Sequence, residues 1–251
     1  MYKKVIIKIS GEGLAGDKIS GRHFDDKTVN RIVAEIKALV AQGVEASIVV
    51  GGGNFWRGAE AKPEMDKTKA HQIGMMGTVM NGIYLAEHFR MAGVPSVVMT
   101  PFDLNGFTQR FTKEIALEAM ANRRVVIFAG GTGHPFFSTD SIVAIRACEL
   151  NVDAVLYAKS VDSVYNADPK KADKSGLRRY KTVSYQTVVA NNLNVADISA
   201  INLTAGENID SVVFSLLKEG SIIAAAQGEE EALFQIGGTK VANGIEEEYY
   251  V

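Results

Sequence analysis

Hydrophobic residues follow two patterns along this chain. Short uninterrupted runs, rich in β-branched residues, predict buried strands at Val5–Ile9, Ala46–Val50, Val94–Met99, Val125–Ala129, Ala154–Ala158 and Ser211–Leu216. Between these runs, apolar residues at helical spacing predict helices at about 26–42, 71–91, 113–121, 141–150, 184–191 and 197–206. Asp25 or Asp26 can cap the first helix, and Gly43 ends it.

Strands that alternate with helices, each strand apolar throughout, are typical of a largely parallel sheet covered by helices on both faces. No proline-rich linker, internal repeat or change of composition divides the sequence. We therefore expect a single α/β domain over residues 1–251. The lysine-rich stretch 170–181 is predicted to be a solvated loop.

In such sheets, ligands bind beyond the carboxyl ends of the strands, so the loops that follow strands carry the functional information. Four such loops stand out: KISGEG at 8–13, GGGNFWRG at 51–58, GGTGHPFFSTD at 130–140 and AKSVDSVYNADP at 158–169. Glycines free backbone N–H groups to point at phosphate oxygens. Three glycine-rich loops therefore indicate a site for a phosphorylated ligand.

The composition narrows the classes of partner. The net charge is −2, so no overall field directs the protein to nucleic acid or to a membrane. The single cysteine, Cys148, excludes an internal disulfide and suits a reducing compartment. No segment approaches the roughly 18 apolar residues of a membrane span. We expect a cytoplasmic protein without a nucleic-acid or membrane partner.

Two cations accompany the glycine loops. Lys8 lies inside an apolar strand just before Ser10-Gly11, and Arg57 follows three glycines. Lys8 can be an edge-strand residue that extends to water, or a charge that stabilises a phosphoryl group in transfer. No stretch fits the P-loop pattern G-x-x-x-x-G-K-[ST], and no G-x-G-x-x-G follows the first strand. Phosphate binding here thus uses neither of these two common designs.

Taken together, the loops resemble the bacterial uridylate (UMP) kinases of the amino acid kinase superfamily. The resemblance runs in order along nearly the whole chain, through KISGE at 8–12, GGGNFWRG at 51–58, IGMMGTVMNG at 73–82, GTGHPFFSTD at 131–140 and VDSVYNADPKK at 161–171. It implies a three-layer α/β/α sandwich around a mainly parallel eight-stranded sheet. It further implies transfer of the ATP γ-phosphoryl group to UMP, a hexamer, and regulation by nucleotides.

The resemblance also assigns candidate site residues, with the N-terminal part of the chain on the acceptor side and the C-terminal part on the ATP side. The catalytic set is Lys8, Arg57 and Asp140. ATP is expected to contact Lys8, Ser10, Gly11, Gly53, Arg57, Lys159, Tyr165 and Asp168. UMP is expected to contact Gly52, His71, Thr132, Gly133, His134, Pro135, Phe136, Phe137, Ser138 and Thr139. No metal ligand set is expected, and Mg²⁺ is expected to arrive as MgATP. Three glycines at 51–53 are explained by phosphates of two nucleotides that press on one loop. Asp140 can also be the N-cap of the following helix.

The chain departs from the family pattern at three places. His71 stands where the family carries an aspartate, and His134 where it carries an asparagine. A histidine can hydrogen-bond a hydroxyl but cannot accept from two at once as a carboxylate does. The family's A-T-K-V-D reads here Ala158-Lys159-Ser160-Val161-Asp162, so the lysine is displaced by one residue and can point to another face. The C-terminal tail, ending EEEYYV, is also longer than expected.

The phosphate-handling residues are intact, while the acceptor residues are altered. A second hypothesis is therefore a relative that binds nucleotide for storage or regulation, or one with a shifted substrate. A carbamate- or acylglutamate-type kinase fits less well, because GTG-PFF and the IGMMGTVMN helix resemble the uridylate kinases.

Overall fold

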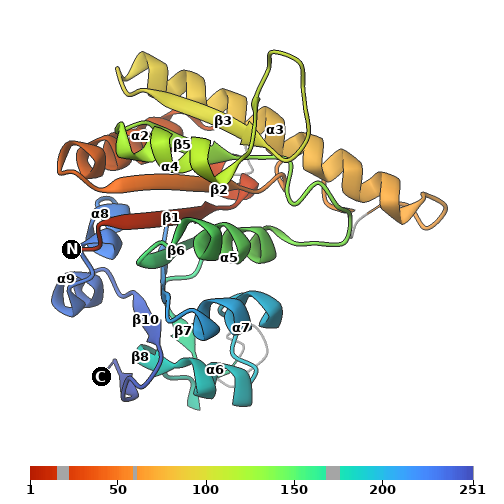
Figure 1. The fold of residues 1–251 in the computed structure, drawn as a ribbon. Coiled ribbons are helices and arrows are strands. Elements are labelled where there is room, and N and C mark those ends of the chain that lie inside the picture. The colour runs from red at the N-terminus through yellow and green to blue at the C-terminus, as the bar shows by residue number, and fades with distance from the viewer. Residues whose placement is uncertain (16–22, 59–60, 168–175, 251) are drawn as a thin grey trace.

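The computed structural model describes residues 1–15, 23–58, 61–167 and 176–250 (Figure 1). Eight of the described strands have four or more residues: β1 (Lys4–Ile9), β2 (Glu45–Val50), β3 (Ser96–Thr100), β5 (Val125–Phe128), β6 (Ala154–Lys159), β8 (Arg179–Ser184), β9 (Asp210–Ser215) and β10 (Thr239–Ala242). Three more have two residues each: β4 (Gln109–Arg110), β7 (Val164–Tyr165) and β11 (Glu248–Tyr249). The described helices are α1 (Gly11–Ala15), α2 (Asp26–Ala41), α3 (Lys67–Met91), α4 (Lys113–Ala121), α5 (Thr139–Leu150), α6 (Tyr185–Ala190), α7 (Ile198–Gly206), α8 (Ser221–Gln227) and α9 (Glu230–Gln235).

One sheet runs through the described chain in the order β11-β8-β10-β9-β6-β1-β2-β5-β3-β4, with β7 paired to β8. From β9 across to β4 every neighbouring pair is parallel, and antiparallel pairs occur where β10 meets β9 and where β7 and β11 meet β8. The central strand β1 lies between β2, which follows it, and β6, which comes much later. The order of the strands therefore reverses at β1. Open parallel sheets bind ligands at such a switch point.

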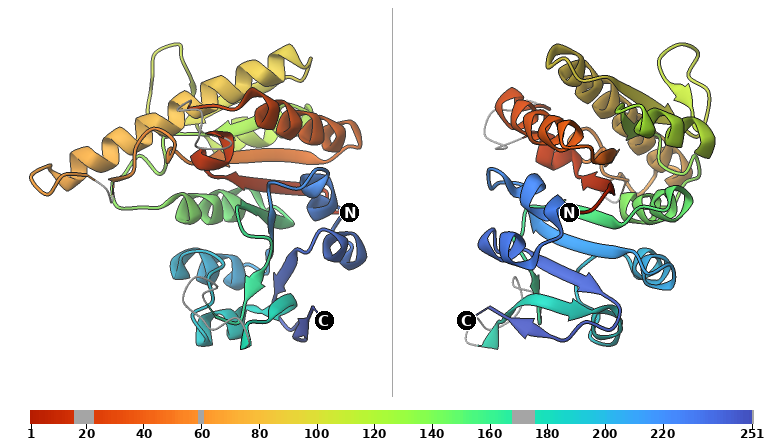
Figure 2. Two further views of the ribbon diagram at one scale, coloured as in Figure 1. Left: turned by 180° about the vertical axis from the view of Figure 1, so that it is seen from behind. Right: turned by 60° about the vertical axis from the view of Figure 1, so that its left-hand side comes forward.

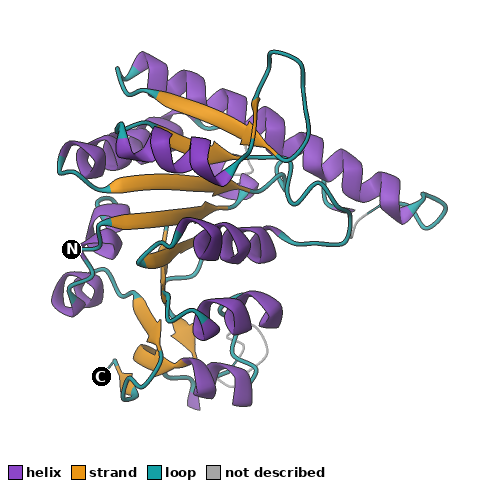
Figure 3. Ribbon diagram, in the orientation of Figure 1, coloured by secondary structure: helices purple, strands orange, loops and turns teal. Residues whose placement is uncertain are grey.

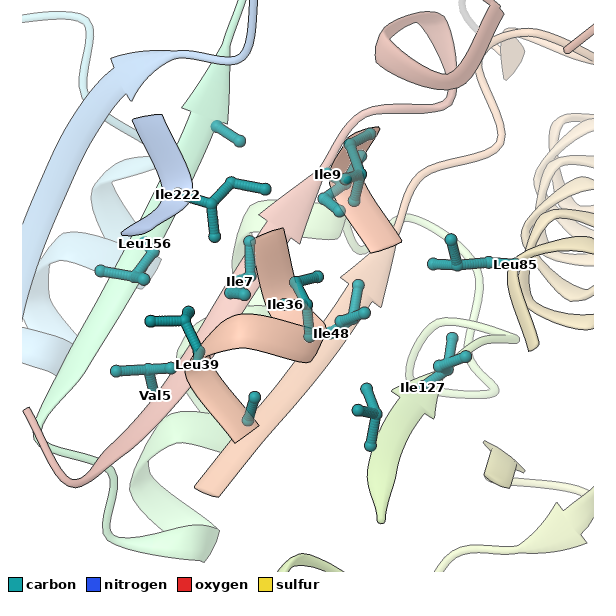
Figure 4. Packing of buried hydrophobic residues seen from close by; sticks show 14 of the residues in the cluster. Val5, Ile7, Ile9, Ile36, Leu39, Ile48, Leu85, Ile127, Leu156 and Ile222 are labelled. Atoms are coloured by element: carbon teal, nitrogen blue, oxygen red, sulfur yellow. The ribbon is translucent and has the colours of Figure 1, made fainter. Parts of the chain in front are cut away.

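Helices cover both faces of the sheet, as the two views in Figure 2 show. Alternate residues of β1 belong to different cores: Val5, Ile7 and Ile9 pack with α2, α3 and α8, whereas Ile6 packs with α4, α5 and α7. Figure 4 shows the first of these cores, with Ile36 and Leu39 of α2 against the strand residues. The three-layer α/β/α arrangement around a mainly parallel sheet is thus confirmed.

Most predicted elements are present, with shifted ends (Figure 3). Asp25 caps α2 by accepting a hydrogen bond from the Thr28 backbone N–H at 3.1 Å. The helix expected from about residue 71 begins at Lys67, because Asp66 caps it. The N-terminal half of α3 projects beyond the sheet (Figures 1 and 2).

One prediction in the C-terminal half fails in part. The loop predicted over 170–181 is wrong at its end, because Arg179 to Lys181 begin strand β8. This strand alternates charged and buried residues, with Tyr180 and Thr182 inward, so no continuous apolar run marks it. The helix predicted over Ser141–Leu150 is present as α5, which begins slightly earlier, at Thr139, with Ser138 as its cap.

Among the described residues, no helix combines the length and the apolar run that crossing a bilayer requires.

Candidate active site

Three glycine-rich loops meet at the carboxyl ends of β1, β2 and β5. The loop after β2 joins the end of β1 through a hydrogen bond from the Gly51 N–H to the Ile9 carbonyl at 2.8 Å. Helix α3 fixes the other contacts. Asn81 donates to the Gly51 carbonyl at 2.6 Å, and Thr78 Oγ1 accepts from the Gly130 N–H at 2.7 Å. One rigid helix therefore positions the loops after β2 and β5 relative to each other.

The glycines at 51–53 do not share one cause. A Cβ at Gly51 would lie 3.0 Å from the Gly11 nitrogen, and a Cβ at Gly52 would lie 2.7 Å from the Gly74 carbonyl oxygen. The protein's own backbone thus presses on these two positions. A Cβ at Gly53 would have no described neighbour nearer than 3.7 Å. The expectation that phosphates account for all three glycines needs correction, because only Gly53 has room for an approaching ligand.

Lys8 points from β1 toward α5 and forms an ion pair there. Its Nζ lies 3.0 Å from Asp140 Oδ1, and the two side chains are 15% and 18% exposed. The contact is an ion pair without the geometry of a directed hydrogen bond. Lys8 is therefore not an edge-strand lysine extended to water, because β1 is the central strand and its charge faces a carboxylate.

Lys159 ends β6 on the same sheet face. In β6, Val155 and Tyr157 belong to the core under α5, and Lys159 continues that alternation. Burial lowers the pKa of Lys159, the nearby positive charge of Lys8 lowers it further, and the Asp140 and Asp197 carboxylates oppose the shift. Although its position along the sequence is displaced, Lys159 thus adds a second cation beside Lys8 and Asp140.

Asp140 does not cap α5, which contradicts the alternative considered for it. Ser138 is the cap, and its hydroxyl accepts hydrogen bonds from the N–H groups of Asp140 and Ser141 at 3.1 and 3.2 Å. The Ser138 hydroxyl donates to Asp197, just before α7. The Asp140 carboxylate is thereby left to face Lys8 from the first turn of α5.

Arg57 extends from the loop after β2 to the loop after β1, where its guanidinium forms an ion pair with Glu12. Both side chains are more than a third exposed. Gly53 lies beneath this pair, because a Cβ there would approach Arg57 Nε and Glu12 Oε1 at 3.8 Å each. A guanidinium can bind two oxygens of a carboxylate or of a phosphate in the same geometry.

A cavity of about 290 Å³ opens beside these charges, between the loop after β2, α3 and the loop after β5. We call it the central cavity. Of the predicted acceptor residues, those that line it are Gly52, His71, His134, Pro135, Phe137, Ser138 and Thr139, together with Gly53 from the predicted ATP set. Sequence reasoning did not assign the other lining residues, among them Trp56, Met75 and Thr78.

Thr132, Gly133 and Phe136 complete the loop around the central cavity without lining it. Thr132 Oγ1 accepts from the His134 N–H at 3.0 Å, which holds the turn. Phe136 has a positive φ of 71°, a conformation that is uncommon outside glycine. Its exposed ring lies 4.7 Å from the His71 ring, centroid to centroid. Phe136, with its uncommon backbone conformation, therefore meets His71, which departs from the family pattern, at the rim of the central cavity.

The predicted ATP residues separate into two groups. Ser10 and Gly11 lie beside Lys8, where Ser10 Oγ accepts from the Gly13 N–H at 3.1 Å. Tyr165 lies in β7 on the other side of β6, and its hydroxyl donates to Asp162 at 2.9 Å. Arg179 binds the second oxygen of Asp162 at 2.8 Å. Asp168 lies outside the described residues.

Among the described residues, no group of three or more histidine, cysteine, aspartate or glutamate side chains could hold a metal ion. The chemistry that the described side chains do support is electrostatic. Two lysines and an arginine stand where glycine loops expose backbone N–H groups, next to a cavity of ligand size. Positioned cations and N–H groups are what transfer of a phosphoryl group between two bound molecules requires.

Known proteins share this fold. The model of the amino acid kinase family matches residues 3–215. The crystal structure of UMP kinase from Bacillus anthracis superposes with a TM-score of 0.90 and 33% identity, covering 100% of this chain and 99% of that one. UMP kinase from Ureaplasma parvum gives a TM-score of 0.87 and 30% identity over 97% of this chain and 100% of that one. Uridylate kinase from Archaeoglobus fulgidus, at 23% identity and a TM-score of 0.71, shares the fold.

Proposed function

Because this chain belongs to the amino acid kinase family, we propose that it is a UMP kinase, which transfers the γ-phosphoryl group of ATP to UMP. The observation that carries the proposal is the ion pair of Lys8 and Asp140 at the switch point of the sheet, beside the central cavity. The similarity to two UMP kinases over nearly their full lengths supports the same conclusion.

In the proposed reaction, an oxygen of the UMP phosphate attacks the γ-phosphorus of ATP. A new P–O bond forms, the bond from the γ-phosphorus to the β–γ bridging oxygen breaks, and ADP and UDP leave. The attacking oxygen is already ionised at neutral pH, so no general base is needed. Catalysis then depends on holding the two anions in line and neutralising their charge.

The cations divide this work. Lys8 and Lys159 approach the transferring group from the sheet, and Asp140 orients both and offsets their mutual repulsion. Arg57 binds phosphate from above Gly53, in exchange for its contact with Glu12. Ser10 and Gly11 contact the ATP phosphates. Tyr165 binds the adenosine end, held there by Asp162. Mg²⁺, carried by the phosphates of ATP, supplies further charge neutralisation.

The acceptor occupies the central cavity, with its phosphate toward Gly52 and Gly53. His71 and His134 then stand against the nucleotide from α3 and from the loop after β5. We propose that His71→Asp with His134→Asn, which restores the residues of the family pattern, raises the activity on UMP.

We infer that the chain associates with further copies, as a hexamer by resemblance. Helix α3 presents an apolar stripe of Ile73, Met76, Met80 and Ile83, with exposures of 43, 42, 46 and 39%. These residues recur at intervals of three and four, so they share one face of the helix. Light scattering coupled to size-exclusion chromatography measures the mass of the assembly and so tests the proposed hexamer. We further propose that the reaction takes place in the cytoplasm and belongs to pyrimidine nucleotide biosynthesis.

A panel of nucleoside monophosphates with ATP and Mg²⁺ tests the function. Release of ADP is measured for UMP, CMP, AMP, GMP and dTMP, and we expect UMP to have the highest kcat/KM. The Lys8→Ala variant is the control that assigns turnover to this site. Binding of ATP and UMP without turnover would instead support the storage or regulatory alternative, which the similarity to UMP kinases does not favour.

A further inference from the structure

The C-terminal tail, residues 243–250, returns to the sheet and adds the edge strand β11 beside β8 (Figure 1). Tyr249 pairs with Tyr180 of β8. Beyond β11, the N–H of Tyr250 donates to the Arg179 carbonyl at 2.9 Å. The tail, which is longer than the family pattern, is therefore held along β8 as far as the residue where that strand begins.

The two tyrosines of the tail each hold one of two neighbouring arginines. The Arg178 Cζ lies over the Tyr249 ring, 3.6 Å from its centroid. The Arg179 Cζ lies over the Tyr250 ring, 4.6 Å from its centroid. A guanidinium is attracted to the face of an aromatic ring. Because successive residues of a strand point to opposite faces, the two ring contacts lie on opposite faces of β8.

Arg179 connects the tail to the predicted ATP residues. Its Nη1 donates to Asp162 Oδ2 at 2.8 Å, and the other oxygen of Asp162 accepts from the Tyr165 hydroxyl at 2.9 Å. A chain of contacts thus runs from Tyr250 through Arg179 and Asp162 to Tyr165. The Arg178 guanidinium lies on the opposite face of β8 from this chain.

The chain of contacts lies at the edge of the sheet where ligands bind. Asp162 belongs to the loop after β6, three residues beyond Lys159. A Cβ at Gly237 would lie 3.6 Å from Arg179 Nη1 and 3.3 Å from the Nζ of Lys218, in the loop after β9. Strands β6 and β9 are parallel neighbours, so their carboxyl ends meet at the same edge.

The Tyr250 ring supplies an order that the ion pair lacks by itself. The side chains of Arg179 and Asp162 are 36% and 27% exposed. Such a pair contributes little, because two flexible side chains must lose freedom to form it. The Tyr250 hydroxyl donates to the Gly238 carbonyl at 2.6 Å, which fixes the ring under the guanidinium. The guanidinium is therefore already placed when Asp162 binds it.

We propose that Tyr250 is a positioning residue for ATP, whose ring holds Arg179 so that Asp162 fixes the orientation of Tyr165. The inference rests on the proposed function, in which Tyr165 binds the adenosine end of ATP, and extends it to the tail. The affinity for ATP then depends on a residue that does not touch ATP. None of these residues is among those that line the central cavity, so binding of the acceptor is independent of the tail.

The Tyr250→Ala variant removes the ring. We expect the KM for ATP to rise about three- to tenfold, as for loss of one cation–π contact, with kcat and the KM for UMP within about twofold of wild type. Calorimetry should show the same weakening of ATP binding. Tyr250→Phe keeps the ring and should keep the KM for ATP within about twofold of wild type. An unchanged KM for ATP in Tyr250→Ala overturns the proposal.

Tyr249→Ala is the matched control, because it removes the neighbouring ring from the opposite face of β8. The Tyr249 ring packs against Tyr180, 4.4 Å between centroids, so urea denaturation should show a loss of stability. Its KM for ATP should stay within about twofold of wild type. If Tyr249→Ala and Tyr250→Ala raise the KM for ATP equally, the tail acts only through stability and the proposal fails.

A double substitution tests the route through Arg179. In Arg179→Met the chain of contacts is already broken, so adding Tyr250→Ala should not raise the KM for ATP again. Effects of the two substitutions that multiply in full would show that Tyr250 acts independently of Arg179, which overturns the route.

The outcomes separate this inference from the proposed function. If the wild-type protein turns over no nucleoside monophosphate, the kinase proposal fails, and calorimetry of ATP binding still decides whether Tyr250 supports the ATP site. Absence of ATP binding would overturn both. If UMP is turned over normally and Tyr250→Ala keeps the wild-type KM for ATP, the assignment of Tyr250 fails and the kinase stands.

Discussion

Replacing Lys8 with alanine separates the catalytic role of this residue from its contribution to stability. The side chain ends 3.0 Å from Asp140. It belongs to a central strand and lies near the carboxyl end of that strand, where parallel sheets bind ligands. If Lys8 stabilises the phosphoryl group only in transfer, its loss lowers kcat and kcat/KM together. Removing one electrostatic stabiliser costs roughly 2–4 kcal/mol, which corresponds to about a 30- to 800-fold loss of rate.

The structure bounds the accompanying loss of stability. Breaking a fully buried ion pair costs roughly 3–5 kcal/mol, and breaking an exposed one costs about 0–1 kcal/mol. The Lys8–Asp140 pair lies between these cases, with 15% and 18% of its side chains exposed. Lys159 also remains near Asp140 after the substitution. We therefore expect the free energy of unfolding to fall by only about 1–2 kcal/mol.

The assay compares Lys8→Ala with a matched control from the same strand. Lys4 forms an ion pair with Glu45 at 3.7 Å, at the opposite end of β1 and far from the glycine loops. Steady-state release of ADP gives kcat and KM for both substrates, and urea denaturation gives the free energy of unfolding. Lys4→Ala should change stability slightly and leave kcat unchanged.

One result would refute the reasoning. If Lys8→Ala keeps kcat within about twofold of wild type while losing several kcal/mol of stability, Lys8 is a structural residue and the transferring group lies elsewhere. The same conclusion would follow if Lys8→Ala and the control Lys4→Ala changed kcat by the same factor.

Three further outcomes follow from the same geometry. Arg57→Lys keeps the charge but loses the two-oxygen fork, so calorimetry should show nucleotide binding several-fold weaker, with unfolding changed by less than about 0.5 kcal/mol; unchanged binding would leave Arg57 only its ion pair with Glu12. Gly52→Ala forces a Cβ to within 2.7 Å of an α3 carbonyl oxygen and should cost about 1–3 kcal/mol in urea denaturation, whereas Gly53→Ala should unfold as wild type and bind nucleotide less well. Equal stability of the two variants would contradict the packing argument. Burial lowers the pKa of Lys159, so its ammonium loses the proton at a lower pH than an exposed lysine does. The cost of burying that charge is present below the folded-state pKa and disappears as the pH rises toward the unfolded-state value. Calorimetry from pH 7 to 10 should therefore show that ATP affinity falls in the wild type as Lys159 loses its proton, and that it stays unchanged in Lys159→Arg. Identical pH profiles of the two proteins would mean that Lys159 does not contact ATP.

The order of strands and helices was predictable because apolar runs and helical spacing record it directly. The predictions failed where burial is not continuous along the sequence. Strand β8 alternates Arg179 and Lys181 with buried Tyr180 and Thr182, and this pattern was interpreted as a loop. The short strand β10 and helices α8 and α9 had no strong pattern of their own and were not predicted. Their stability comes from packing against β9 and α2, which sequence spacing does not record.

The sequence by itself determined which residue types stand at the carboxyl ends of the strands. Lys8, the glycines, Arg57 and Asp140 are local features, because strand ends and turns are local and parallel strands bring them to one edge. What only the tertiary structure decided is which of these groups meet. Register between β1 and β6 and the crossing of α5 bring Lys159 near Lys8 and Asp140, although the position of Lys159 along the sequence suggested otherwise. The approach of α3 explains Gly52 by a backbone contact and places Trp56 in the wall of the central cavity. Such contacts join residues far apart in the chain, and they depend on distances of a few tenths of an ångström that no sequence pattern records.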